Sequence, residues 1–239
     1  MFKLPFYNRK NYTLLRFVGN SKYAYDLAPP TLTGKAKHCT FSGKRIEDNL
    51  QRTIQGTFRT CYGLVSSYNK SITIPNWADI MISVNDDKLD VLSSAKIGPA
   101  FEVTDHTDDP DFNMQKGMSV LKFVNPWRVV METSETNPEF VVASHLLNTT
   151  PMMIPTGVVT FKWQHDLNIF NKVNCNYNQQ YKIPFKHPLV QVFPLSNSKL
   201  YVETEYDPVK YNQLSHVNTG IPYFRGTHIK LLKPNKQKT

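Results

Sequence analysis

The sequence predicts a mainly β protein, a single-domain β-sandwich or jelly roll (a double-stranded β-helix) with one or two short helices. Apolar and polar residues alternate in five separate stretches, which places successive side chains on opposite faces of a strand. The 14 Phe and 12 Tyr favour strands, and the 16 Pro interrupt any long helical pattern. Many short strands with Pro, Gly and Asn turns are typical of sandwiches and jelly rolls.

One domain with an extension at each end is expected. The chain has 239 residues, 40% of them hydrophobic, so it can bury a sizeable core. No internal repeat or low-complexity linker divides it. We expect an N-terminal extension over residues 1–57 that packs on the main domain, a sandwich or jelly-roll core over 58–206, and a C-terminal helix with a basic tail over 207–239.

Two helices are predicted, one in each extension. Residues 43–55 carry three Ile or Leu residues at helical spacing, on one face of a helix. The second helix is predicted over 207–217. There Asp207 is placed to cap the helix and Pro208 to occupy its first position, where the missing N–H costs nothing.

Strand signals in the first half of the chain are short. Residues 71–74 and 79–84 alternate apolar and polar side chains, and an Asn-Asp-Asp turn follows at 85–87. Residues 89–103 predict a weaker pair of strands around a Gly-Pro turn. The acidic residues 105–111 predict a loop.

The strongest strand signals lie in the second half. Residues 118–133 and 140–147 predict a hairpin with a longer loop. The two ends of the stretch 154–195 predict a further pair of strands, joined by an Asn- and Gln-rich loop. Residues 199–205 alternate apolar with charged side chains and predict the last strand.

The core is predicted from the alternate positions of these strands. The residues that should be largely buried are Phe123, Trp127, Val129, Val159, Phe161, Val190 and Val192. Leu200 and Val202 also share one strand face. Trp77 and Trp127 lie in or beside strands, so packing in or near the core is the expected role of both.

Several short motifs between residues 58 and 195 match one family. They are Cys-Tyr-Gly at 61–63, Ile-Pro-Asn-Trp-Ala-Asp-Ile at 74–80, Lys-Phe-Val-Asn-Pro-Trp at 122–127, an Asn-rich turn at 147–150, and the runs 154–159 and 183–194. On these motifs the chain resembles an uncharacterised family of small proteins from tailed bacteriophages, especially marine cyanophages. It departs from the family at 134–138, where the family tends to carry a Pro-Gly-Tyr turn. The resemblance implies a viral origin and an all-β fold, and it implies no established activity.

His106 and Asp108 are the strongest candidates for a catalytic role, as ligands of a metal ion. Two residues apart on a strand, their side chains point to the same side. With His187 as third ligand they would form the facial triad of a non-haem iron oxygenase, a class whose sites lie inside jelly-roll barrels. The competing interpretation is a solvated acidic loop and a structural His, and it is favoured because four Asp residues crowd 105–111.

Other catalytic patterns are weak. His165 and Asp166 are neighbours in a predicted strand and so face opposite sides, which excludes a charge relay between them. No nucleophile elbow, metalloprotease helix motif or Gly-rich phosphate loop occurs in the sequence. The three cysteines, which lack metal-site spacing, are expected to be free thiols in a reducing compartment; they are Cys39, Cys61 and Cys175.

Binding is the alternative to catalysis. The net charge of +9 favours an anionic partner through long-range attraction. Trp163, with Lys162 beside it, is the best candidate for an aromatic platform that takes a sugar or a base. Packing of Trp163 in or near the core is the competing interpretation.

The expected function is that of a non-enzymatic bacteriophage protein, a structural component of the virion that binds other virion proteins or copies of itself. The alternatives are an intracellular host-takeover factor and a cupin-like Fe(II)-dependent oxygenase that uses His106, Asp108 and His187. No cofactor is predicted. No apolar run is long enough for a membrane span or a secretory signal, so we expect no membrane partner and a location in the virion or the infected cell's cytoplasm.

Overall fold

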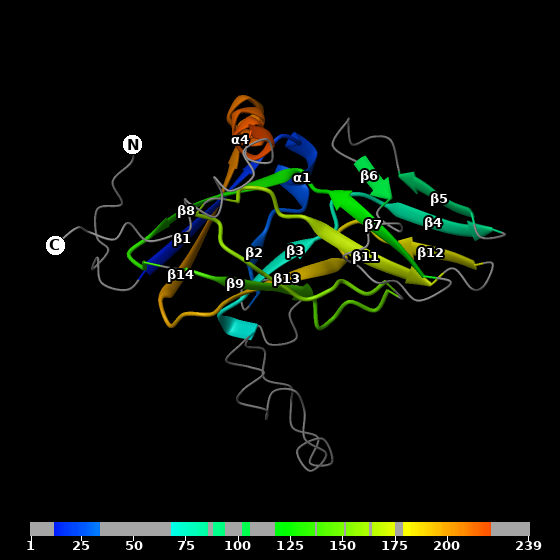
Figure 1. Ribbon diagram of the computed structural model, residues 1–239, viewed down its shortest axis with the longest axis horizontal. Coiled ribbons are helices and arrows are strands. Elements are labelled where there is room, and N and C mark those ends of the chain that lie inside the picture. Colours follow the sequence, from blue (N-terminus) through cyan, green and yellow to red (C-terminus); the bar gives the residue numbers. More distant parts are fainter. Residues whose placement is uncertain are drawn as a thin grey trace, which may run out of the picture.

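The fold is mainly β, as the sequence predicts (Figure 1). It was obtained as a computed structural model that describes residues 12–33, 68–85, 88–93, 102–105, 118–136, 138–150, 152–162, 164–174 and 179–220. These residues contain two helices and fourteen strands in four sheets. Buried side chains from all four sheets form one core cluster, an arrangement consistent with a β-sandwich.

Two of the sheets lie at opposite ends of the view in Figure 1, the first of them next to the helices. The first sheet contains, in spatial order, β14 (Lys199–Tyr206), β1 (Tyr12–Gly19) and β8 (Trp127–Thr133). A sheet at the other end contains β12 (Gln179–Ile183), β4 (Ile80–Asn85) and β5 (Lys88–Ser93). Only the pairing of β1 with β14 is parallel among the described strands.

The remaining sheets lie between and beside these two (Figure 1). The five-stranded sheet contains β10 (Gly157–Val159), β9 (Phe140–Ser144), β13 (Pro188–Pro194), β3 (Ile72–Pro75) and β2 (Thr31–Leu32). The fourth sheet contains β11 (Ile169–Asn174), β7 (Met118–Val124) and β6 (Glu102–Asp105). Strands at adjacent places along the chain therefore often belong to different sheets.

A buried asparagine, Asn76, turns the chain from the five-stranded sheet into the sheet of β4. Its side-chain Nδ2 donates to the carbonyl oxygens of Ile183 and Pro184, each at 3.0 Å, and also to that of Ala78. Its backbone N–H donates to the carbonyl of His187 at 2.7 Å. β3 pairs with β13 and β4 pairs with β12, so one asparagine side chain joins both bent strand pairs at the corner.

A second buried asparagine, Asn125, makes the corner between β7 and β8. Its Nδ2 donates to the carbonyl of Leu167, and its Oδ1 accepts the backbone N–H of Trp127 at 2.8 Å. Its own carbonyl accepts the hydroxyl of Tyr211 at 3.1 Å. Each corner is followed by a fully buried tryptophan, Trp77 or Trp127, so the Ile-Pro-Asn-Trp and Val-Asn-Pro-Trp motifs have the same structural role.

Two helices pack beside the sheet of β1 (Figure 1). The first, α1 (Lys22–Leu27), is capped by Ser21, whose hydroxyl accepts the N–H of Ala24 at 3.2 Å. The second, α4 (Pro208–Gly220), confirms the helix predicted over 207–217. Asp207 caps it by accepting the N–H of Lys210 at 2.9 Å. The helix predicted over 43–55 lies outside the described residues.

The core is largely as predicted. Buried side chains occur at all the predicted positions except one, namely at Phe123, Trp127, Val129, Phe161, Val190 and Val192. Val159 is half-buried because β10 lies at the edge of its sheet, where only one neighbour covers it. Leu200 and Val202 are partly buried against the core.

The predicted strand pairings are wrong where the chain changes sheet. β8 and β9 do not form a hairpin, because β8 pairs with β1 whereas β9 pairs with β13 and β10. The stretch 154–195 contains four strands, and none of them pairs with another. β5 and β6 also belong to different sheets. Within the region expected to be an N-terminal extension, β1 is the central strand of a sheet.

Candidate binding site

A cluster of buried polar side chains lies on the five-stranded sheet, on the face opposite the core. Thr73 of β3 and Gln191 of β13 are direct partners in the strand register, so their side chains lie next to each other. Their neighbours along each strand, such as Ile72 and Val192, point to the other face and belong to the core. The members of this polar cluster are Thr33, Tyr68, Ser71, Thr73, His145 and Gln191.

Hydrogen bonds in the polar cluster determine which ring nitrogen of His145 carries the proton. Its Nδ1 accepts the backbone N–H of Leu147 at 3.0 Å, so the proton of the neutral ring lies on Nε2. Nε2 then donates to the hydroxyl oxygen of Thr73 at 3.1 Å, and Thr73 donates to that of Thr33 at 2.9 Å. His145 therefore does not accept the Thr73 proton, and the pair is not an activated nucleophile with its base.

A second chain of hydrogen bonds completes the polar cluster. The side-chain amide of Gln191 donates to the hydroxyl oxygen of Ser71 at 2.7 Å. That hydroxyl lies 2.8 Å from the hydroxyl of Thr33 and 2.9 Å from the carbonyl of Tyr68. The cluster thus holds the chain on both sides of Lys70, because Tyr68 and Ser71 flank it.

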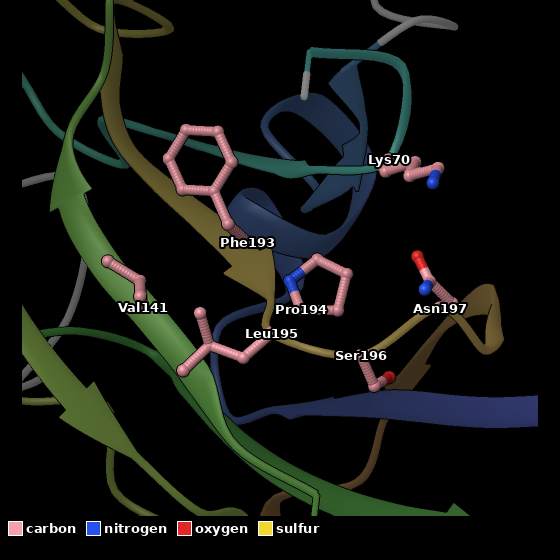
Figure 2. Close-up of a pocket in the computed structure, with 7 residues that line it drawn as sticks. All are labelled: Lys70, Val141, Phe193, Pro194, Leu195, Ser196 and Asn197. Carbon is pink, nitrogen blue, oxygen red and sulfur yellow. The ribbon is translucent and has the colours of Figure 1, made fainter. Parts of the chain in front are cut away.

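An open pocket of about 390 Å³ begins beside this cluster, where β13 ends. Figure 2 shows Phe193 and Val141 on one side, from the neighbouring strands β13 and β9, and Lys70 and Asn197 on the other. The remaining lining residues are Pro194, the last residue of β13, and the two residues that follow it, Leu195 and Ser196. The volume is in the range of sites for small molecules or for a few side chains of a partner.

Among the described residues that line the pocket, Lys70 is the one that carries a charge. Its ammonium group makes no ion pair with any described residue. The backbone at the opposite rim is fixed, because Leu195 donates its N–H to the carbonyl of Glu139 at 2.9 Å. An apolar group that carries a carboxylate would place its apolar part against Phe193 and its charge toward Lys70.

Of the three predicted metal ligands, His187 alone lies within the described residues. His106 and Asp108 lie outside those residues. His187 follows the β12–β13 turn, where its Nε2 donates to the Oδ1 of Asn148 at 3.0 Å. No group of three or more potential ligands from His, Cys, Asp and Glu occurs within the part of the chain that the structure describes.

The other predicted site residues lie in different parts of the structure or outside the described residues. Lys162 is exposed in a turn, and Trp163 lies outside the described residues. His165 and Asp166 are not within a strand, which corrects the prediction. Both contact β8, since the Nδ1 of His165 lies 2.8 Å from the carbonyl of Val129 and Asp166 pairs with Arg128 at 2.5 Å. They are therefore part of the packing of the fold.

The pKa of His187 predicts how stability depends on pH. Burial lowers the pKa of His187 below its ordinary value of 6.5, so the unfolded chain binds a proton there more readily than the folded one. The stabilising contribution is complete above that value and is lost as the pH falls below it. Urea unfolding between pH 8 and 5 should therefore show a smaller acid-induced loss of stability in His187→Gln than in wild type. An equal or larger loss in the variant would contradict this assignment.

Comparison of the chain with protein-family models, with curated proteins and with solved structures gives no match. The resemblance to bacteriophage proteins thus stays a prediction. In the described residues, no helix combines the length and apolar character needed to cross a membrane.

Proposed function

We propose that the protein is a binding component of a bacteriophage particle and that it docks on another virion protein through the pocket beside Lys70. The observation that carries the proposal is the pocket at the end of β13, with an apolar wall and a single lysine that has no acidic partner among the described residues. This combination suits the end of a protein chain or an acidic side chain next to an apolar one.

The position of the pocket supports docking rather than enclosure of a small molecule. Its rim includes side chains that are open to solvent, among them Leu195, which is 57% exposed. The polar cluster behind it fixes the backbone on both sides of Lys70, so the lysine starts from a defined position. A partner that covers Leu195 would gain apolar contact, and Lys70 would add specificity for an anionic group.

Mass spectrometry of purified particles tests the proposal. We expect many copies of the wild-type protein per particle. Lys70→Glu should reduce incorporation by at least about tenfold, because a like charge then faces the partner's carboxylate. Lys182→Glu, a charge reversal at an exposed position of β12 outside the pocket, is the matched control and should be incorporated normally.

Two results would contradict the proposal. One is absence of the wild-type protein from particles with abundance in infected cells, which would favour a host-takeover role. The other is normal incorporation of Lys70→Glu, which would remove the pocket from the interface. Both variants should be checked for wild-type melting temperature, since each changes an exposed lysine.

A further inference from the structure

A second surface, separate from the pocket, combines aromatic rings with lysines. It is formed by α1, by the turn between β12 and β13, and by the end of β14. We call it the aromatic–lysine platform and define it by Lys22, Tyr23, Tyr25, Phe185, Lys186 and Tyr206. None of these six side chains is acidic.

The rings of the platform form two pairs, one on each side of α1. Tyr23 and Phe185 have ring centroids 5.0 Å apart, and Tyr25 and Tyr206 have centroids 6.2 Å apart. One ring of each pair is open to solvent, because Tyr23 and Tyr206 are each 42% exposed. A flat ligand therefore has an accessible ring at either pair.

Each pair of rings carries a lysine. The Nζ of Lys22 lies 4.9 Å from the ring centroid of Tyr25 and 5.7 Å from that of Tyr206. The Nζ of Lys186 lies 5.2 Å from the ring centroid of Phe185. Lys22 also pairs with Asp26 at 2.8 Å, whereas Lys186 has no acidic partner among the described residues. Lys186 is thus available to an anion from outside.

The turn that presents Phe185 and Lys186 is held by the Asn76 corner. The backbone N–H of Phe185 donates to a carboxylate oxygen of Asp79 at 3.0 Å, and that of Lys186 donates to the carbonyl of Asn76 at 2.8 Å. Because buried Asn76 anchors this turn, the two side chains project from a fixed backbone. A pre-positioned surface loses less conformational entropy when it binds a ligand.

Lys186 occupies a backbone conformation that favours glycine. Its φ is 67°, in the left-handed region, and it is the one non-glycine residue with positive φ in the described part of the chain. A lysine there is strained, whereas a glycine would relieve the strain. Strain that a smaller residue would remove points to a use for the side chain itself.

Net charge over the described residues does not by itself favour an anionic partner. Of the 28 Lys and Arg and the 19 Asp and Glu in the chain, 12 of each lie in the described residues, which leaves 16 basic against 7 acidic residues in the rest of the sequence. The described residues thus have a formal net charge of zero. The case for an anionic group in the partner rests on Lys186, and the exposed rings indicate that the partner also has flat apolar faces.

We propose that the aromatic–lysine platform binds single-stranded nucleic acid. Unpaired bases stack on exposed aromatic rings with little dependence on sequence, and neighbouring phosphates interact with lysines. A duplex would not offer its base faces to Tyr23 or Tyr206, because the bases of a duplex are already stacked on one another inside the double helix. Base stacking would thus occur at the two ring pairs, and Lys186 would contact a phosphate.

Fluorescence anisotropy with the full-length protein tests this. The probes are a labelled oligothymidine of about 20 nucleotides and a duplex of the same length, at low and at physiological salt. The single strand should bind more tightly than the duplex. Tyr23→Ala and Phe185→Ala should each weaken single-strand binding by about tenfold. Lys186→Gln should lower the slope of log affinity against log salt by about 0.7.

Two further variants separate binding from folding. Lys186→Gly should weaken binding while the melting temperature stays at or above that of wild type, because the substitution relieves the positive-φ strain. Phe170→Ala is the matched control, since Lys122 lies over the ring of Phe170 at 6.0 Å on the β7–β11 sheet, outside the platform. It should bind as wild type does.

Three outcomes would overturn the proposal. They are equal affinity for the duplex, full affinity in Tyr23→Ala and Phe185→Ala, and an equal loss in Phe170→Ala. Full affinity in the ring variants would assign any binding to charge alone. Failure of both probes to bind would overturn it as well, and would leave the platform to another class of partner.

Discussion

Replacing Asn76 by Ala should lower the free energy of unfolding by about 3 kcal/mol, because buried carbonyls lose their donor and each such loss costs about 1–3 kcal/mol. The Nδ2 of Asn76 donates to carbonyls on both sides of the corner, including those of Ile183 and Pro184. Asn76 is completely buried, so water does not replace the missing donor without rearrangement. Urea unfolding followed by tryptophan fluorescence measures the change.

Asn197→Ala is the matched control for Asn76→Ala. Asn197 is exposed, and its substitution should change the free energy of unfolding by no more than about 0.5 kcal/mol. A loss below about 1 kcal/mol in Asn76→Ala would show that the corner does not depend on this side chain. The turn that carries Phe185 and Lys186 would then need another anchor.

Phe161→Ala should lower the free energy of unfolding by about 3–5 kcal/mol, the usual cost of truncating a buried phenylalanine. Phe161 is fully buried and its ring centroid lies 5.3 Å from that of Phe140 on β9. The substitution leaves a cavity beside Phe140, and the surrounding strands close it only in part. Thermal and urea unfolding should both report the loss.

Val158→Ala provides the comparison for Phe161→Ala. Val158 is three residues away on β10 and is 60% exposed, so its truncation removes little buried surface. We expect a change within about 0.5 kcal/mol. If Phe161→Ala costs less than about 1 kcal/mol, the packing of Phe161 against Phe140 does not contribute as its burial indicates.

The strands could be predicted from the sequence, whereas their partners could not. Alternation of apolar and polar residues fixes which face a side chain occupies, and it placed Phe123, Val129 and Val192 in the core correctly. It contains no information about the neighbouring strand. β8 follows β7 after two residues, yet the corner at Asn125 sends it to another sheet, where its partner β1 is more than a hundred residues away.

The sequence indicated the candidate site less clearly than it indicated the strands. Thr73 and Gln191 are single polar residues in apolar strands, and their alternate positions indicated only that one face is less apolar. The contact of Thr73 with His145 and the pairing of Thr73 with Gln191 depend on the register of β3, β13 and β9, which the sequence does not specify. The platform rings likewise come together from segments about 160 residues apart, a distance that no local pattern spans.

The pairing of β1 with β14 has a consequence for synthesis on the ribosome. Arg16 and Glu203 form an ion pair across these strands, and they are 187 residues apart in sequence. At about 5–20 residues per second, β1 emerges roughly 10–40 s before its parallel partner exists. Its apolar side chains, among them Leu15 and Phe17, have no complete sheet to enter during that time. The nascent chain is thus a candidate for chaperone binding until its last strand is made.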